Sequence, residues 1–581
     1  MHVMRSRWRI LLYILCALVL LCAAWLWWNR PQQVDMAAYA PADALIYLEA
    51  NNLPDIFDGL TKTEAWQALA PAAGLRTDFN RLTWLSRVVA WTGIGPAESV
   101  LLTRAQMAVV VMGIDAAEEP GQALHIKPRA ALVVETHTSR WRMQPAVEKM
   151  IGDYARRAHG DARVERKESD DATILTWPHP RGGLPIIAAV VDSVVIVGND
   201  EASVEACLAV RRGTRGALVN DPQLAEMRAR LRADDAQAFG YVPQAGTHRL
   251  VAVAALAYAG RLADDQRVQS AAAIILPQLA DRLIGGAAWS ARVRDGAMAD
   301  TYFLAVQKGL PPRLREALTP EGQPTSGAAA LLPADVYQMT RYDYRQPEAS
   351  WRELQAAISS ELDITYAPLI TRFLNEALKP FGIAEPREFL RAAGPELATV
   401  RLDDAGESLL LVAQVRDGEA LRALVKKQLG AVRFERAGDA ELWVSGDEER
   451  GTAAFVDNYL IMGGGEDVRR CLAARSSAQT LAASEAFKRA GRFASTDDPA
   501  GVVTYTVDRA GARDFISLLA RQRALRMNAN ANEAALQRAL DARPYAVSET
   551  RPVEGGFERR TLSAFGLFGL IAGQFSVEAG R

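Results

Sequence analysis

The sequence predicts an α+β protein with an N-terminal transmembrane helix and two tandem homologous lobes. In each lobe we expect a mainly antiparallel sheet with helices packed on one face. Three observations predict this fold: one apolar run near the N-terminus, an order of motifs that occurs twice, and strands that come in hairpin pairs between helical segments. The chain has 581 residues, of which 49% are hydrophobic and 23% charged, an ordinary globular composition.

The charge balance argues against a nucleic-acid partner. The chain carries 67 Lys and Arg against 69 Asp and Glu, so its formal net charge is −2. Nucleic-acid binding requires a concentrated basic surface, which this balance does not indicate. The cysteines, Cys16, Cys22, Cys207 and Cys471, are too few for a disulfide scaffold.

The apolar run over residues 10–28 (ILLYILCALVLLCAAWLWW) predicts the membrane helix. At 1.5 Å per residue it reaches about 28 Å, close to the roughly 30 Å hydrocarbon core of a bilayer. Arg5, Arg7 and Arg9 precede the run, and only Arg30 follows it closely. By the positive-inside rule, residues 1–9 are cytoplasmic and the body is periplasmic or otherwise extracytoplasmic. We therefore expect a single-pass protein of the bacterial inner membrane, whose first partner is the lipid bilayer.

Two other N-terminal signals fit the run less well. A cleaved signal peptide has an apolar core of about 7–15 residues and a small-x-small cleavage site, and this run is longer. A lipoprotein signal places a small residue before the modified cysteine, but Leu21 precedes Cys22 and Leu15 precedes Cys16. The apolar stretches 250–260 and 565–575 are too short to span as helices.

The body contains the same motifs twice in the same order. Pro41-Ala42-Asp43 recurs at 333–335, and the segment 189–208 (AVVDSVVIVGNDEASVEACL) matches 454–472 (AFVDNYLIMGGGEDVRRCL). The spacing between equivalent motifs falls from 292 to 265 residues, so the first copy is 27 residues longer. We assign most of the excess to surface loops near 113–130 and 155–185. The predicted domains are lobe 1 at 38–308, a Pro- and Gly-rich linker at 309–330, and lobe 2 at 331–581.

Apolar periodicity and turn residues predict the elements of the first copy. The strands are expected at 44–50, 107–114, 130–137, 173–178, 185–191, 193–198, 237–242, 287–294 and 299–306. The helices are expected at 53–71, 77–92, 141–158, 201–211, 222–232 and 247–284, the last of them broken. Hairpin turns are expected at Asp192-Ser193 and its equivalent Asp457-Asn458, and at Asp295-Gly296 and its equivalent Gly555-Gly556.

Three stretches of the body resemble an uncharacterised family of bacterial membrane-anchored, extracytoplasmic proteins that carry a domain of unknown function. They are PADALIYL at 41–48, LPADVYQM at 332–339 and GIAEPREFLRAAGPELATV at 382–400. The resemblance covers most of the body and implies a location in the cell envelope. It supplies no activity and no catalytic residues.

No residue is assigned a catalytic, cofactor-binding or metal-binding role from the sequence. Apart from His2 the histidines fall in the first copy, which excludes a histidine-dependent site common to both lobes, and no HExxH or CxxC spacing occurs. Gly463-Gly464-Gly465 follows a strand and is interpreted as a tight turn that needs positive φ. Cys207 and Cys471 are interpreted as buried core residues, with a disulfide between the copies as the alternative.

Three functional hypotheses follow. The first is a non-enzymatic binding or scaffold module whose partner is an envelope protein or the cell wall. The second is a carrier or sensor of an apolar ligand such as a lipid, which uses apolar helices such as 250–260 and 270–284. The third is a hydrolase whose site is scattered in the sequence.

Overall fold

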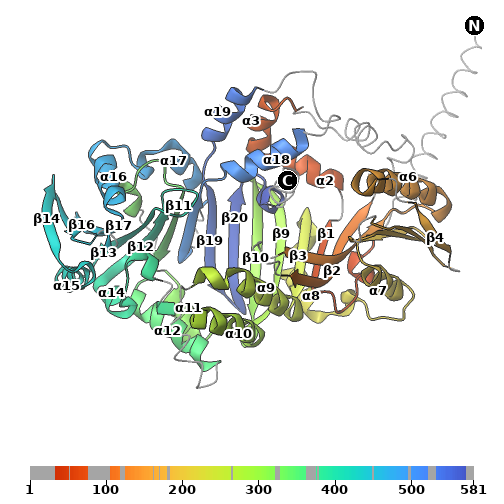
Figure 1. The fold of residues 1–581 in the computed structure, drawn as a ribbon, viewed down its shortest axis with the longest axis horizontal. Coiled ribbons are helices and arrows are strands. Elements are labelled where there is room, and N and C mark those ends of the chain that lie inside the picture. Colours follow the sequence, from red (N-terminus) through yellow and green to blue (C-terminus); the bar gives the residue numbers. More distant parts are fainter. Residues whose placement is uncertain are drawn as a thin grey trace, which may run out of the picture.

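The computed structural model describes residues 33–50, 53–75, 105–117, 125–160, 163–168, 171–179, 183–262, 266–320, 327–361, 374–375, 378–447, 450–494, 499–520 and 532–570. The predicted membrane helix at 10–28 and the helix expected at 77–92 lie outside these ranges. Within the described ranges, no helix has the length and apolar character needed to cross a bilayer. The protein is α+β, with one large antiparallel sheet (Figure 1).

The described part of the first half contributes ten strands and the helices between them. The strands are β1 (Ile46–Ala50), β2 (Gln106–Ala117), β3 (His125–Glu135), β4 (Glu165–Glu168), β5 (Thr173–Trp177), β6 (Ile186–Val191), β7 (Val194–Gly198), β8 (Ala238–Pro243), β9 (Ile284–Arg294) and β10 (Ala297–Val306). The helices are η1 (Met36–Ala38), α2 (Leu53–Lys62), α3 (Glu64–Ala72), α6 (Arg140–His159), α7 (Glu201–Arg211), η2 (Leu218–Asn220), α8 (Pro222–Arg230), η3 (Ala233–Asp235), α9 (Gln244–Leu262) and α10 (Gln266–Leu283).

The second half follows the same plan. Its strands are β11 (Gln338–Asp343), β12 (Ala393–Arg401), β13 (Leu409–Val415), β14 (Val432–Ala437), β15 (Ala440–Ser445), β16 (Thr452–Val456), β17 (Tyr459–Gly463), β18 (Val502–Thr506), β19 (Ala546–Val553) and β20 (Gly556–Ser563). Its helices are α11 (Pro312–Leu318), η4 (Ala328–Ala330), α12 (Pro347–Ser360), η5 (Lys379–Phe381), α14 (Pro386–Ala392), α15 (Gly418–Leu429), α16 (Gly465–Ser476), η7 (Leu481–Ala483), α17 (Glu485–Gly491), α18 (Arg509–Ala520) and α19 (Glu533–Asp541).

Among the described residues, the strand pairings form one palindromic sheet of twenty strands, all antiparallel to their neighbours. Across the first half the spatial order is β4-β5-β6-β7-β3-β2-β1-β8-β9-β10. Strand β10 then pairs with β20, and the order continues β20-β19-β18-β11-β12-β13-β17-β16-β15-β14. Each strand of the first half thus has an equivalent at the mirrored position of the second half.

The β10–β20 pair is the seam between the lobes, and a pseudo-twofold axis passes through it. The two equivalent hairpin turns are Asp295-Gly296, as expected, and Glu554-Gly555, one residue before the expected Gly555-Gly556, because Gly556 already belongs to β20. Each turn precedes a seam strand. Thr301 and Arg560 lie at the same distance beyond these turns, and they pair with each other in the register. An antiparallel pair whose equivalent residues face each other is related by a twofold axis perpendicular to the sheet. The seam therefore builds both lobes into one continuous sheet.

Helices cover both faces of the sheet, so the expectation that they pack on one face is wrong. In lobe 1, Ala188 and Val190 of β6 pack with α6, whereas Ala189 and Val191 belong to the cluster that contains Cys207 of α7. In lobe 2, α15 and α16 cover opposite faces of β16 and β17 in the same way. The physical reason is visible in the strands, which are runs of consecutive apolar residues such as IIAAVV rather than alternating ones.

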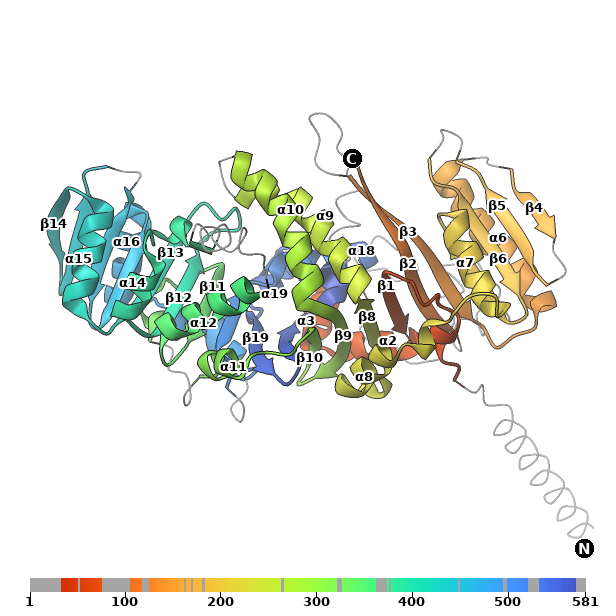
Figure 2. The same ribbon diagram turned by 90° about the horizontal axis from the view of Figure 1, so that it is seen from below.

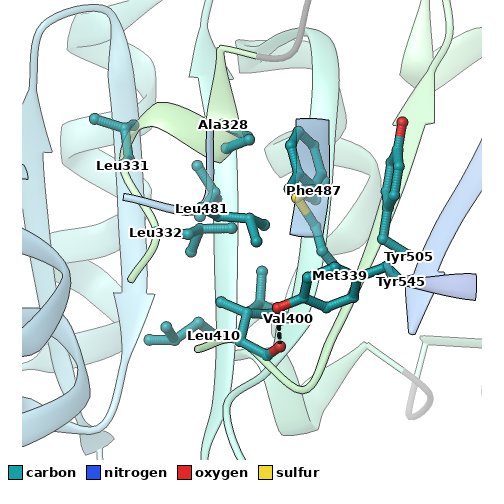
Figure 3. Close-up of a cluster of buried hydrophobic side chains, with 14 of the residues drawn as sticks. Ala328, Leu331, Leu332, Met339, Val400, Leu410, Leu481, Phe487, Tyr505 and Tyr545 are labelled. Carbon is teal, nitrogen blue, oxygen red and sulfur yellow. Dashed lines mark hydrogen bonds between the residues drawn. The ribbon is translucent and has the colours of Figure 1, made fainter. Parts of the chain in front are cut away.

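Equivalent contacts hold the start of each lobe. Pro41 bridges to Ala217 and Pro333 bridges to Thr480, so each Pro-Ala-Asp motif lies against the segment that follows α7 or α16. The core of lobe 2 behind this contact contains Leu332, Met339 and Phe487 (Figure 3). The Tyr545 hydroxyl donates a 2.7 Å hydrogen bond to the carbonyl of Val336. This bond joins the residue just before β19 to this core.

The first helices of each lobe pack against the late helices of the other lobe. Helix α3 packs with α18 and α19 in an apolar cluster that contains Trp66, Leu69 and Leu540. On the other side of the axis, α10 and α12 share a smaller cluster, in which Ile275 and Leu279 of α10 are buried and Ile358 of α12 is partly buried. Figure 2 shows α10 and α12 near the middle of the molecule. These contacts add to the seam in joining the lobes.

The structure confirms the nine strands expected in the first copy and the break in helix 247–284, which becomes α9 and α10. Strand β4 (ERKE) was not expected, because it has no apolar residue. Part of the 27-residue excess lengthens the β2–β3 hairpin and helix α6 rather than forming loops, since the loop assigned to 113–130 contains the ends of both strands. Helix α6 ends at His159, close to the expected end at 158, and Gly160 (φ 76°) follows its last residue. Within the span expected as linker, residues Pro312–Leu318 form helix α11.

Candidate functional site at the lobe junction

An apolar pocket lies where the two lobes meet, beside the seam. Its volume is about 330 Å³. The walls come from the end of α10, the seam strands, α11 and α12. The apolar lining side chains include Leu283, Ile284, Leu304, Val306, Leu314, Leu354, Ala357, Ile358 and Phe557. Pockets of this size and lining are typical of small-molecule sites.

A shallow polar depression opens beside this pocket and shares part of its lining. It is bounded by Gln244, Asp281, Arg282, Gln307, Lys308, Ser360 and Glu361. The Lys308 ammonium contacts the Glu361 carboxylate at 2.6 Å, and Arg282 donates a 2.8 Å hydrogen bond to the backbone carbonyl of Glu361. Its charged side chains are two cations and two carboxylates. We call this depression the polar shelf and the cavity beside it the apolar pocket.

The pseudo-twofold axis relates the apolar pocket to a region that is filled. On that side, Trp66 of α3 is only 2% exposed and packs among side chains of α18 and α19. On the pocket side, the described residues of the α10–α12 cluster include no aromatic side chain. The same architecture thus leaves space on one side of the seam and fills it on the other.

Two neighbouring carboxylates, the buried Asp300 and the partly buried Asp508, lie near the filled side of the junction, on the sheet face opposite Thr301. Asp300 is 1% exposed, and its two oxygens accept hydrogen bonds from the Trp289 indole (2.8 Å) and the backbone N–H of Leu567 (3.0 Å). Asp508 accepts a 2.6 Å hydrogen bond from the backbone N–H of Ala564. Burial raises the pKa of Asp300 to about 6, and the nearby Asp508 charge adds to the increase. Burial likewise raises the pKa of Asp508 to about 6. Together they hold the segment that follows β20.

The raised pKa of Asp300 predicts a pH-dependent effect of Asp300→Asn. Because the folded-state pKa of about 6 exceeds the unfolded value of about 3.9, wild-type stability falls as pH rises through that window. The asparagine cannot ionise, so the stability of the variant does not fall in this way as the pH rises. We expect the free energy of unfolding of the variant, minus that of the wild type, to rise by about 2–3 kcal/mol between about pH 4 and about pH 7.

Urea unfolding at both pH values measures this difference. Asp58→Asn is the control, because the Asp58 side chain is 50% exposed. A difference for Asp300→Asn that stays constant with pH would contradict the assignment of a raised pKa to this carboxyl.

A buried ionic network lies on the other face of the sheet in lobe 1. The Arg228 guanidinium of α8 contacts Glu49 of β1 at 2.7 Å and Asp35 at 2.8 Å. The Tyr47 hydroxyl donates a 2.6 Å hydrogen bond to Glu49, which is 6% exposed. Burial raises the pKa of Glu49 even though Arg228 lies beside it. The equivalent positions of Tyr47 and Glu49 in lobe 2 are Met339 and Arg341, so this network belongs to lobe 1 alone.

The two body cysteines are buried core residues, as expected. Cys207 and Cys471 are both free and 0% exposed, and they belong to the separate cores of the two lobes. The alternative of a disulfide between the copies is therefore wrong. Burial raises the pKa of each thiol to about 12, which keeps both protonated.

The glycine run at 463–465 serves close packing rather than positive φ, so that part of the interpretation is wrong. None of the three glycines has a positive φ. A Cβ on Gly463 would lie 2.7 Å from the Leu409 carbonyl oxygen, and one on Gly198 would lie 3.0 Å from that of Ala130. Both glycines let the neighbouring strand approach. Glu466 and Asp467 stand in the first turn of α16, which disfavours an anion there.

The hairpin prediction at the two aspartates is confirmed. Asp192 (φ 48°) and Asp457 (φ 50°) occupy equivalent two-residue turns. Each carboxylate also contacts an arginine at the end of the next helix, Arg211 or Arg475, at 3.1 Å. These residues have a structural role, and the structure does not bring them to the junction.

His137 lies at the end of β3, where its Nε2 is 3.2 Å from the Gln106 side-chain oxygen. Among the described residues, no group of three or more His, Cys, Asp or Glu side chains could hold a metal ion. The apolar pocket was not predictable from the sequence, since its walls come from four separate segments. The apolar stretch 270–284 was the one signal that pointed to it.

Comparison with known proteins gives no match: no family model, no curated protein and no solved structure is significantly similar to this chain.

Proposed function

We propose that the chain is a single-pass, membrane-anchored protein of the bacterial envelope and that its body, two homologous lobes, is a non-enzymatic binding or scaffold module. The apolar run at 10–28 and the resemblance to envelope proteins support the location. The continuous seam supports the scaffold role, because it holds both lobes as one sheet. An envelope protein or a cell-wall component would be the partner.

Exposed aromatic residues at the outer ends of the two lobes provide positions for testing this proposal. Trp141 of α6 is 70% exposed and Phe434 of β14 is 56% exposed. Figure 1 shows these two elements at opposite ends of the molecule. Exposed aromatic side chains are enriched at protein interfaces.

We expect benzoylphenylalanine at position 141 or 434 to form a discrete cross-linked adduct when intact cells are irradiated. The label at Lys62, whose side chain is 67% exposed on lobe 1 but belongs to neither end, is the control and should give no such adduct. Gel mobility and mass spectrometry identify the product. Failure to form an adduct at both outer positions would count against a protein partner on these surfaces and leave the cell wall as the partner to test.

The apolar pocket favours a second candidate function, a carrier or sensor of an apolar ligand. Its lining is mainly hydrophobic, and its polar lining residues are the ones it shares with the polar shelf. The hydrolase hypothesis finds less support, because Asp300 is only 1% exposed and Asp508 accepts a hydrogen bond from the backbone N–H of Ala564.

A further inference from the structure

The apolar pocket and the polar shelf are adjacent parts of one surface feature. They share Arg282, Lys308, Ser360 and Glu361. A ligand that fills the pocket therefore has its outer end at the shelf. This arrangement matches an amphiphile, which has an apolar tail and a polar head.

We infer that this composite site binds a single-chain amphiphile with a zwitterionic headgroup. The inference rests on the carrier function proposed above and names its ligand class. The pocket volume of about 330 Å³ lies at the low end of the range of about 300–1,000 Å³ for ligand sites, which suits one acyl chain rather than two. Each methylene placed in the pocket strengthens binding about fourfold.

The charges of the polar shelf determine which kind of headgroup it favours. Arg282 and Lys308 supply two positive charges, and Asp281 and Glu361 supply two negative charges. A purely anionic or purely cationic head gains from one pair and is repelled by the other. A zwitterion places a charge of each sign against its opposite, and the Gln244, Gln307 and Ser360 side chains can hydrogen-bond to its remaining polar atoms.

The full-length protein in phosphatidylcholine nanodiscs allows a direct test. The probe is a dodecylphosphocholine analogue with a photoactivatable diazirine on its chain. After irradiation, peptide mass spectrometry locates the label. We expect label on α11 and α12, near Leu314 and Ala357. Because the probe also partitions into the bilayer, label on the peptide that contains residues 10–28 is the internal control for its delivery.

Two alanines of α12 give a matched pair of variants. Ala357 lines the pocket, whereas its neighbour Ala356 is exposed. Ala357→Phe should fill the pocket and lower the labelling of α11 and α12 at least tenfold. Ala356→Phe adds the same side chain on the solvent side of the same helix and should leave labelling within twofold of wild type. Equal labelling of the two variants, or label confined to residues 10–28, would overturn the site.

Competition with unlabelled amphiphiles of equal chain length tests the headgroup and its source. Dodecylphosphocholine should compete at least fivefold more strongly than dodecanoate or dodecyltrimethylammonium. If dodecanoate competes best, the ligand is a free fatty acid and the zwitterionic assignment is wrong. The cross-linking at positions 141 and 434 is independent of this test. A cross-linked protein partner without amphiphile labelling would support the scaffold proposal alone. Amphiphile labelling without a cross-linked partner would support the amphiphile site alone.

Discussion

Replacing Arg228 with methionine is expected to lower the free energy of unfolding by about 3–5 kcal/mol near neutral pH. The methionine has a similar apolar length but removes the cation that contacts Glu49 and Asp35. Glu49 is 6% exposed, so its carboxylate would remain buried and would keep the Tyr47 hydroxyl as its partner from the original network. Chemical denaturation followed by circular dichroism measures the loss.

Two further variants isolate the cause of this loss. Adding Glu49→Gln to Arg228→Met removes the uncompensated charge and should recover at least half of the lost stability. Lys62→Met removes a cation from the exposed pair with Asp58, whose side chains are 67% and 50% exposed, and should cost no more than about 0.5 kcal/mol. If the double variant is less stable than Arg228→Met, the buried charge is not the source of the effect.

Gly556→Ala should disrupt the seam. Gly556 of β20 pairs with Ala305 of β10, and a Cβ at this position would lie 2.0 Å from the carbonyl oxygen of Leu304. That oxygen belongs to the backbone of the other lobe, so no side-chain rotation relieves the clash. We expect a loss of about 3 kcal/mol or more in the free energy of unfolding. Hydrogen exchange of the β10 and β20 amides should accelerate before that of β6 and β16.

The control for this variant is Gly491→Ala. Gly491 ends α17, and a Cβ there would meet no heavy atom within 4 Å. Alanine also favours the helix, so we expect the free energy of unfolding to increase, by less than about 1 kcal/mol. Similar losses at Gly556 and Gly491 would show that the seam is not sensitive to this clash.

Both pairs of variants probe features that local sequence patterns only partly reveal. The equivalent turns at Asp192 and Asp457 were predictable, because an aspartate between two apolar runs marks a hairpin and occurs at the same place twice. The burial of Cys207 and Cys471 was also predictable, because a small apolar cysteine occurs at the same place in both copies. By contrast, the need for glycine at 463 comes from a strand that precedes it by more than fifty residues, so only the pairing reveals it.

The sequence by itself determined the local elements and their repetition. Hydrophobic periodicity placed the strands of the first copy, and the repeated motifs showed that a second set would follow in the same order. It also supplied the argument for a membrane anchor at 10–28, since a span depends on the length and composition of one contiguous segment. These properties are encoded within short stretches of chain.

Only the tertiary structure decided how the two copies combine. The pairing of Thr301 with Arg560 joins residues more than 250 positions apart, and no pattern within either strand specifies it. Helices on both faces, the buried contact of Arg228 with Glu49, and the apolar pocket at the junction all follow from that assembly. Each depends on side chains that meet only after distant segments pack, which is why local patterns predicted the parts and the packing created the candidate site.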